Sequence, residues 1–177
     1  MIRIIGAKGD IENTDQFLKK INDLSKKHKI VIQVLDANMV YGKKHLISAS
    51  RHAIRAIRRK KNSTNSLPME ILLYASGERQ IRLSIQKMGI KTGKKKPIAL
   101  VFIDNIADLP EANGKISDQN IDEIIKQLGI TRNDNVLKGN IETLKKFGIN
   151  ENAIKTVVKD KYEDLILEKV ALVDIIK

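Results

Sequence analysis

The first 35 residues alternate between two kinds of apolar pattern. Residues 2–7 and 30–35 are short runs rich in Ile and Val, whereas residues 14–27 carry apolar side chains at helical spacing. Thr14 is the expected N-cap of this helix. A third buried strand is predicted at residues 98–103. Because strands separated by helices pack into layers about a sheet, this order predicts an α/β fold.

The longest helical pattern covers residues 43–61, which contain neither Gly internally nor Pro. At 100° per residue, the apolar side chains of this segment fall on one face and the basic ones on the other. The apolar face comprises Leu46, Ala49, Ser50, Ala53, Ile54 and Ile57. The basic face comprises Lys44, Arg51, Arg55, Arg58 and Arg59. We therefore expect a helix that joins the core on one side and presents a basic stripe on the other.

Further helices are predicted where capping residues precede, and glycines follow, an apolar pattern. The run Ser-Leu-Pro-Met-Glu at residues 66–70 begins a helix that should end near Gly77, although residues 71–74 also fit a strand. Residues 78–88 predict the next helix, which should end at Gly89. Four helical segments follow beyond residue 104, at residues 117–129, 140–147, 151–158 and 161–176.

These patterns together define the expected fold. We predict the α/β class, with a small mixed sheet of three to four strands flanked by helices and a helical C-terminal portion. A length of 177 residues suits one domain, and 42% hydrophobic residues suffice for a core. We therefore expect residues 1–177 to form a single domain, with the helical portion, about residues 117–177, packed on the same core.

Several classes of protein are disfavoured by what the sequence lacks. Without cysteine, the chain has no disulfide, thiolate metal site or thiol nucleophile, which fits an intracellular protein. It shows neither a signal peptide nor a run of about 18 uncharged apolar residues, so a soluble, cytoplasmic protein without membrane contact is expected. Aromatic residues make up only 3% of the chain, which disfavours a single-strand binder that stacks many bases.

The excess positive charge lies in one part of the chain. There are 33 basic and 21 acidic residues, a formal charge of +12. Residues 43–96 hold 15 of the basic residues but only two acidic ones, Glu70 and Glu78, whereas the rest of the chain is nearly neutral. A segregated positive segment attracts polyanions through the release of counterions, so it predicts a nucleic-acid or anionic-lipid partner. The alternative is an ordinary solvated surface of a protein from a lysine-rich proteome.

No group of residues forms a recognisable catalytic centre. Residues 89–94 read Gly-Ile-Lys-Thr-Gly-Lys, but only three residues separate the glycines, and Lys95 stands where a phosphate-binding loop needs Ser or Thr. His45 and His52 share one flank of the predicted helix without a third ligand, so we interpret them as cap or boundary residues of the fold. We expect no catalytic residue, no metal site and no cofactor.

Two stretches of the sequence resemble a known family. Residues 36–46 read Asp-Ala-Asn-Met-Val-Tyr-Gly-Lys-Lys-His-Leu, and residues 71–81 read Ile-Leu-Leu-Tyr-Ala-Ser-Gly-Glu-Arg-Gln-Ile. Together they resemble the small non-catalytic subunit of the KEOPS tRNA-modifying complex, the CGI-121 or PRPK-binding protein family. The resemblance is specific over residues 36–104, is looser before them, and reappears at residues 165–174.

The resemblance implies a function that the residues alone do not define. A protein of this family is a compact α/β subunit, not an enzyme, that binds the kinase-like ATPase subunit of KEOPS and supports its activity. It also recruits tRNA by its 3′ acceptor end, and the complex installs threonylcarbamoyladenosine beside the anticodon. The open alternatives are a free-standing RNA-binding module and, less favoured, a nucleotide-acting enzyme that would need His45 or Asp36.

Two sets of candidate contacts follow. The tRNA candidates are basic side chains and one helix corner, because guanidinium groups and lysines bind phosphates and polar side chains read splayed bases. They are Arg51, Arg55, Arg58, Arg59, Lys60, Lys61, Arg79, Gln80, Lys94, Lys95 and Lys96. Candidate contacts to the ATPase partner are Ile81, Leu83, Ile85 and Met88. Leu83 points away from the other three on a helical wheel, so the apolar residues cover more of the helix than one core contact needs. Residues 76–80 also fit a purely structural corner between two helices.

Overall fold

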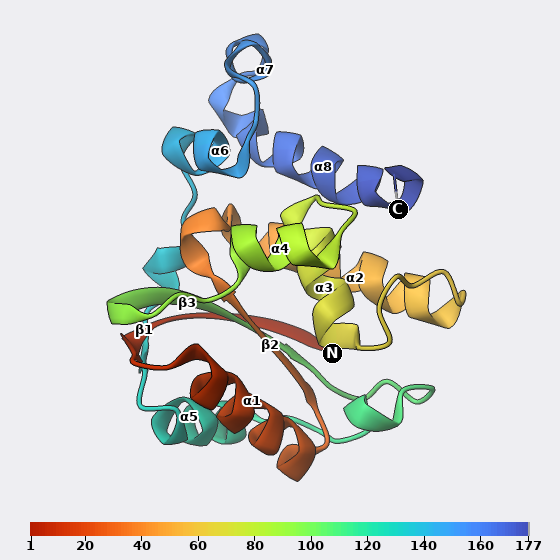
Figure 1. Cartoon of the computed structure of the whole chain (residues 1–177), viewed down its shortest axis with the longest axis vertical. Helices are drawn as coiled ribbons and strands as arrows, with labels where there is room; N and C mark the ends of the chain where they lie inside the picture. The colour runs from red at the N-terminus through yellow and green to blue at the C-terminus, as the bar shows by residue number, and fades with distance from the viewer. Residues whose placement is uncertain (177) are drawn as a thin grey trace.

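A four-stranded sheet with helices on both faces forms the centre of the molecule (Figure 1). The computed structural model describes residues 1–176. The strands are β1 (Ile2–Ile11), β2 (Val31–Asp36), β3 (Gly93–Ile103) and β4 (Thr131–Arg132), in the sheet order β2-β3-β1-β4. The helices are α1 (Thr14–His28), α2 (Gly42–Arg58), α3 (Leu67–Ser76), α4 (Ile81–Met88), α5 (Asp118–Gln127), α6 (Ile141–Phe147), α7 (Glu151–Thr156) and α8 (Tyr162–Ile176). The predicted α/β class and the helical C-terminal portion are confirmed.

The sheet is antiparallel at every strand pair of residues 1–176, where a mixed sheet was expected. The strands β1 and β2, joined through α1, run in the same direction, but β3 lies between them. In the register of the sheet, Ile103 pairs with Ile2 on one side and with Val31 on the other. The insertion of β3 therefore replaces a parallel contact with two antiparallel ones.

Strand β3 begins earlier than its apolar run. The predicted strand covered only residues 98–103. Instead Gly93 pairs with Ile11, because β1 continues past Gly9 through a register shift and offers β3 a partner there. Lys94 and Lys95 are consequently exposed residues of a strand, and Lys96 is half-buried in it.

Two apolar cores lie on the two faces of the sheet. Alternate residues of β3 point to opposite faces, so Leu100 packs with α1 and α5, whereas Val101 packs with α2 and α3. Figure 1 shows α1 and α5 on one side of the sheet and the other helices on the opposite side. Buried Leu144 of α6 and Val170 of α8 share a cluster with Leu46 of α2. Helix α5 is thus separated by the sheet from the helices that follow it.

The predicted helices α2 and α3 are both present, but their ends differ from the predicted ones. The expected apolar face of α2 is buried except for half-buried Ile57, and the helix ends at Arg58, three residues earlier than predicted. Residues 71–74 are helical, and α3 ends at Ser76, directly before Gly77, whose φ of 68° is left-handed. The N-cap of α1 is Asn13, not Thr14, because the Asn13 side chain accepts the Gln16 backbone N–H at 2.9 Å.

Among residues 1–176, no helix combines the length and apolarity that a membrane crossing needs.

Candidate nucleic-acid and partner interfaces

The basic stripe of α2 ends in a turn that folds the chain back over the helix. The backbone N–H of Lys61 donates to the Ala56 carbonyl at 2.9 Å, and that of Lys60 donates to the Ile57 carbonyl at 3.0 Å. This pair of bonds is a Schellman motif, with Lys60 in the left-handed conformation at a φ of 54°. Because the motif returns residue 61 toward residue 56, Lys61 lies beside the last turn of α2.

The arginines of the stripe fall into two groups. Arg58 donates two hydrogen bonds of 2.7 Å to the carboxylate of Asp108, and Arg55 donates one of 2.8 Å to Asp174. These two side chains are therefore partly neutralised by carboxylates from distant parts of the chain. The other four basic residues at this end make no ion pair within residues 1–176: Arg51, Arg59, Lys60 and Lys61.

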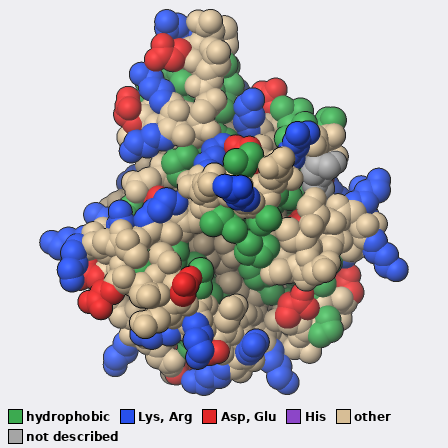
Figure 2. All heavy atoms as spheres, viewed as in Figure 1, with side chains coloured by type: hydrophobic (Ala, Val, Ile, Leu, Met, Phe, Trp, Pro, Cys, Tyr) green, Lys and Arg blue, Asp and Glu red, His purple; other side chains and the backbone are tan. Residues whose placement is uncertain are grey.

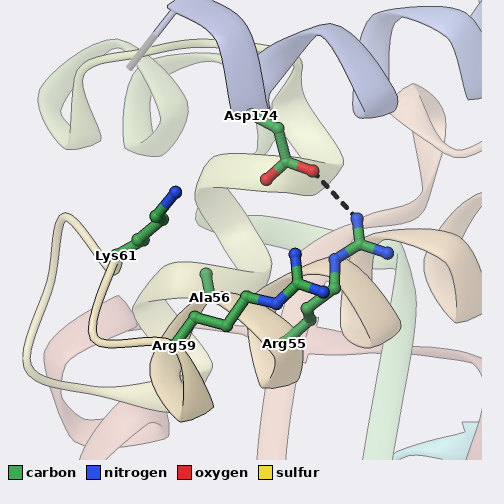
Figure 3. A pocket seen from close by; sticks show the side chains of 5 residues that line it. All are labelled: Arg55, Ala56, Arg59, Lys61 and Asp174. Atoms are coloured by element: carbon green, nitrogen blue, oxygen red, sulfur yellow. Dashed lines mark hydrogen bonds and ion pairs between the residues drawn. The ribbon is translucent and has the colours of Figure 1, made fainter.

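Two hollows lie along this basic face. One has a volume of about 340 Å³ and is lined by Arg55, Ala56, Arg59, Lys61 and Asp174 (Figure 3). The other measures about 430 Å³ and shares Arg55 and Arg59 with the first. The end of α2 is therefore a concave basic surface and not only a row of charges.

Asp174 of α8 is held by three side chains. Its Oδ1 accepts a hydrogen bond from the Tyr74 hydroxyl, and its Oδ2 lies 2.9 Å from Nδ1 of His52 and 2.8 Å from the guanidinium of Arg55. Burial alone would raise the pKa of Asp174, but these hydrogen bonds outweigh it and hold the pKa below its usual value. Sequence reasoning missed this residue; its one signal was a lone carboxylate in the apolar run after Val170.

The loop that follows Lys61 is fixed by a buried carboxylate. Glu70 of α3 is fully buried, and it accepts backbone N–H groups from Ser63 and Thr64 and the hydroxyl of Thr64, all at 3.0–3.3 Å. A buried carboxylate with several donors is stable only when the donors stay in place. Glu70 therefore ties the chain after the basic turn to the start of α3.

The remaining tRNA candidates lie elsewhere on the surface. Lys94 pairs with Asp10 at 3.2 Å at the start of β3, which Figure 1 shows on the opposite side of the molecule from the end of α2. A strand rises roughly 3.3 Å per residue, so Lys95, near the start of β3, lies about 26 Å from the last residue of that strand. Arg79 and Gln80 are exposed in the corner between α3 and α4, so the structural corner is present and their role in binding RNA stays a prediction.

Helix α4 exposes two of its four apolar candidates. Leu83 is 41% exposed and Ile85 is 46% exposed, whereas Ile81 is half-buried. Met88 is fully buried, so its predicted contact with a partner is wrong. Ile85 was also expected to share the core face with Met88, but Ser84 takes that place. Figure 2 shows hydrophobic side chains gathered at the centre of this face, from the lower edge of α4 toward the start of α3.

The face of α4 is set by polar contacts with its neighbours. The Ser76 hydroxyl donates to the Ser84 hydroxyl at 2.8 Å, which turns Ser84 inward and leaves Leu83 and Ile85 on the outside. Lys87 donates to the Ser76 carbonyl at 2.7 Å and lies 3.8 Å above the ring centre of Phe147. The helix is thus anchored to α3 and α6 while its apolar residues remain accessible.

His45 belongs to the core and is not a cap or boundary residue. It is fully buried, its Nδ1 accepts the Tyr41 backbone N–H at 3.2 Å, and its Nε2 contacts the Ala75 carbonyl at 2.8 Å. Since the carbonyl can only accept, Nε2 carries the proton. Burial lowers the pKa of His45 to about 4, so the ring is neutral at pH 7. Within residues 1–176, no group of three or more acidic or histidine side chains could hold a metal.

These features define a class of protein: a small α/β binding protein with a concave basic helix end and an exposed apolar helix. The family model described as kinase binding protein CGI-121 matches residues 9–174 of the chain. The regulatory protein Cgi121 of Methanocaldococcus jannaschii is 30% identical over 149 residues, which cover 82% of this chain and 84% of that relative. The chain therefore belongs to the CGI-121 family, and the resemblance noted in the sequence is confirmed.

Proposed function

We propose that this protein is a non-enzymatic subunit of the KEOPS complex. It binds and supports the kinase-like ATPase subunit, and it recruits tRNA by the 3′ acceptor end for threonylcarbamoyladenosine modification next to the anticodon. Membership of a family described as kinase-binding supports the first role. The observation that carries the proposal is the presence of two chemically different surfaces, the apolar α4 and the basic end of α2, joined by the buried α3.

The apolar surface of α4 suits a protein partner. Leu83 and Ile85 are exposed on a helix that is firmly anchored on its other side, so a partner gains apolar burial without ordering a flexible segment. Exposed Arg82 directly precedes Leu83 in the sequence. We expect the kinase-like ATPase subunit to offer an apolar pocket with acidic residues at its rim.

Substitution of Leu83 tests the protein contact. Leu83→Glu places a charge in the expected interface and should weaken binding of the ATPase subunit at least 10-fold, about 1.4 kcal/mol or more, in co-elution and titration calorimetry. Leu18→Glu is the matched control, because Leu18 is also 41% exposed but lies on α1, across the sheet. Unchanged binding by Leu83→Glu, with thermal unfolding like that of the control, would contradict the proposed contact.

The basic end of α2 suits an RNA end. Sequence-selective proteins bind unpaired RNA, since the A-form major groove is too narrow to admit side chains. The four unpaired basic residues can bind phosphates of a single-stranded tail, and the hollows between them can take its nucleotides.

A comparison of two tRNA ligands tests the RNA role. An electrophoretic shift at one salt concentration should show weaker binding of tRNA that lacks its 3′ trinucleotide than of intact tRNA. Equal affinities would refute recruitment by the 3′ end and leave a generic basic patch. A free-standing RNA-binding module, which the unpaired basic residues also favour, predicts the same tRNA result but no co-elution with the ATPase subunit.

A further inference from the structure

The hollow lined by Asp174 combines one fixed acceptor with two unpaired cations. Tyr74, His52 and Arg55 hold the Asp174 carboxylate in place. Figure 3 shows one carboxylate oxygen joined to Arg55 and the other turned away from Arg55, toward the side on which Lys61 lies. Arg59 and Lys61 make no ion pair within residues 1–176.

Counting lone pairs shows what this carboxylate can still accept. An ionised carboxylate has roughly four acceptor sites. Oδ2 faces both His52 and Arg55, whereas Oδ1 takes one hydrogen bond within residues 1–176, from Tyr74. Oδ1 therefore has one site for another donor. Arg59 and Lys61, which can only donate, need an acceptor. The hollow is thus complementary to a ligand that carries an anion and, next to it, a hydroxyl group.

A nucleotide with an unmodified sugar end has this combination of groups. The hollow of about 340 Å³ is at the lower end of the range for small-molecule sites, roughly 300–1,000 Å³. Among the described residues, its lining includes no aromatic side chain on which a base could stack, so recognition rests on sugar and phosphate. We propose that Asp174 accepts a hydrogen bond from the cis-diol of a ribose, while Arg59 and Lys61 bind the phosphate of the same nucleotide. Carboxylates bind ribose hydroxyls in this way in dinucleotide-binding proteins.

Two sources can supply a phosphorylated ribose with both hydroxyls free. One is a free mononucleotide. The other is the 3′ end of RNA, because every internal nucleotide has its 3′ oxygen esterified. For RNA, the inference rests on the proposed function and adds that the protein reads the chemical state of the terminal ribose. Asp174 is then the residue that discriminates a mature 3′ end from one that is blocked.

Modified ligands test this inference on the unaltered protein. The same tRNA is prepared with a terminal ribose and with a terminal 2′,3′-dideoxyribose, and both are titrated at one salt concentration. Loss of a hydrogen bond to a charged acceptor should weaken binding about 10-fold or more. Equal affinity for both tRNAs would overturn the inference while leaving recruitment of tRNA intact. Adenosine monophosphate and its dideoxy analogue, titrated separately, distinguish a free nucleotide from an RNA end as the source.

An isosteric variant then assigns the discrimination to one side chain. Asp174→Asn should bind ribose-ended tRNA more weakly and lose most of the difference between the two tRNAs. Asp108→Asn is the matched control, because Asp108 also pairs with an α2 arginine but does not line this hollow, and it should retain the full difference. An Asp174→Asn protein that unfolds like the wild type and keeps the full difference would overturn the assignment. If neither tRNA binds but the mononucleotide does, the RNA role fails and the nucleotide site stands.

Discussion

Single polar residues that bridge separate elements determine where the surface features of this protein lie. His45 links the start of α2 to the end of α3, Glu70 holds the loop after the basic turn, and Asp174 joins α8 to α2 and α3. All three have hydrogen-bond partners, which His45 and Glu70 require because they are fully buried. A substitution at His45 or Glu70 therefore acts on an interface without touching it directly, whereas Asp174 itself lines the hollow at the end of α2.

The neutral state of His45 predicts a pH dependence of folding. The pKa of His45 is about 4 in the folded chain and about 6.5 when unfolded, so the unfolded state binds the extra proton between these values. The free energy of unfolding should consequently fall by about 3 kcal/mol as the pH drops from 7 to 4. Urea unfolding at several pH values measures this loss.

His45→Gln is the informative variant, because glutamine also offers a donor and an acceptor but does not titrate. Its unfolding free energy should lack this decline between pH 7 and 4.5. Asp108, Asp134 and Asp174 have lowered pKa values, so their stabilising contributions are present above pH 4 and are lost only below it. Parallel pH profiles for wild type and His45→Gln would contradict the buried neutral ring.

At the scale of elements, long periodic segments could be predicted from the sequence and short ones could not. Seventeen-residue α2 has enough turns for its apolar stripe to define one face, and Leu46, Ala49 and Ala53 are buried as expected. Eight-residue α4 has about two turns, and its apolar residues fit more than one face. The contact of Ser84 with Ser76, which belongs to another helix, decides the orientation.

Pairing between distant segments likewise could not be predicted from patterns in the sequence. The first residues of β3 are mostly charged and become a strand because β1 extends alongside them, and two-residue β4 has no pattern of its own. The carboxylates that neutralise Arg58 and Arg55 lie 50 and 119 positions further along the chain. The sequence therefore indicated which residues are basic, whereas only the fold separates paired from unpaired ones.

At the scale of the whole molecule, the fold divides a charge that is contiguous in the sequence. Residues 43–96 hold 15 of the 33 basic residues. Figure 2 shows Lys and Arg side chains on both flanks of the molecule, over the end of α2 and over the start of β3. A ligand as short as the 3′ tail of a tRNA can contact only one of these two sites, whereas an intact tRNA can reach both.

This separation predicts that two charge-neutralised variants differ in their response to ligand size. One variant carries Arg51→Gln, Arg59→Gln and Lys61→Gln, and the other carries Lys94→Gln, Lys95→Gln and Lys96→Gln. The first should weaken binding of intact tRNA and of a short oligonucleotide with the sequence of its 3′ tail. The second should weaken binding of intact tRNA alone. Wherever a variant weakens binding, the loss of three phosphate contacts should also reduce the salt dependence. The slope of the logarithm of the binding constant against the logarithm of the salt concentration should become smaller by about 2.

A third variant controls for net charge. This variant carries Lys146→Gln, Lys155→Gln and Lys159→Gln, and it also removes three positive charges. The three lysines are exposed residues of the C-terminal region that make no ion pair in the described chain. Their effect on both ligands should be small, because a charge more than a Debye length from the RNA, about 8 Å at physiological salt, is largely screened. Equal weakening by all three variants would show that binding follows net charge, and weakening of the oligonucleotide by the β3 variant would show that the two basic sites act together on the tail.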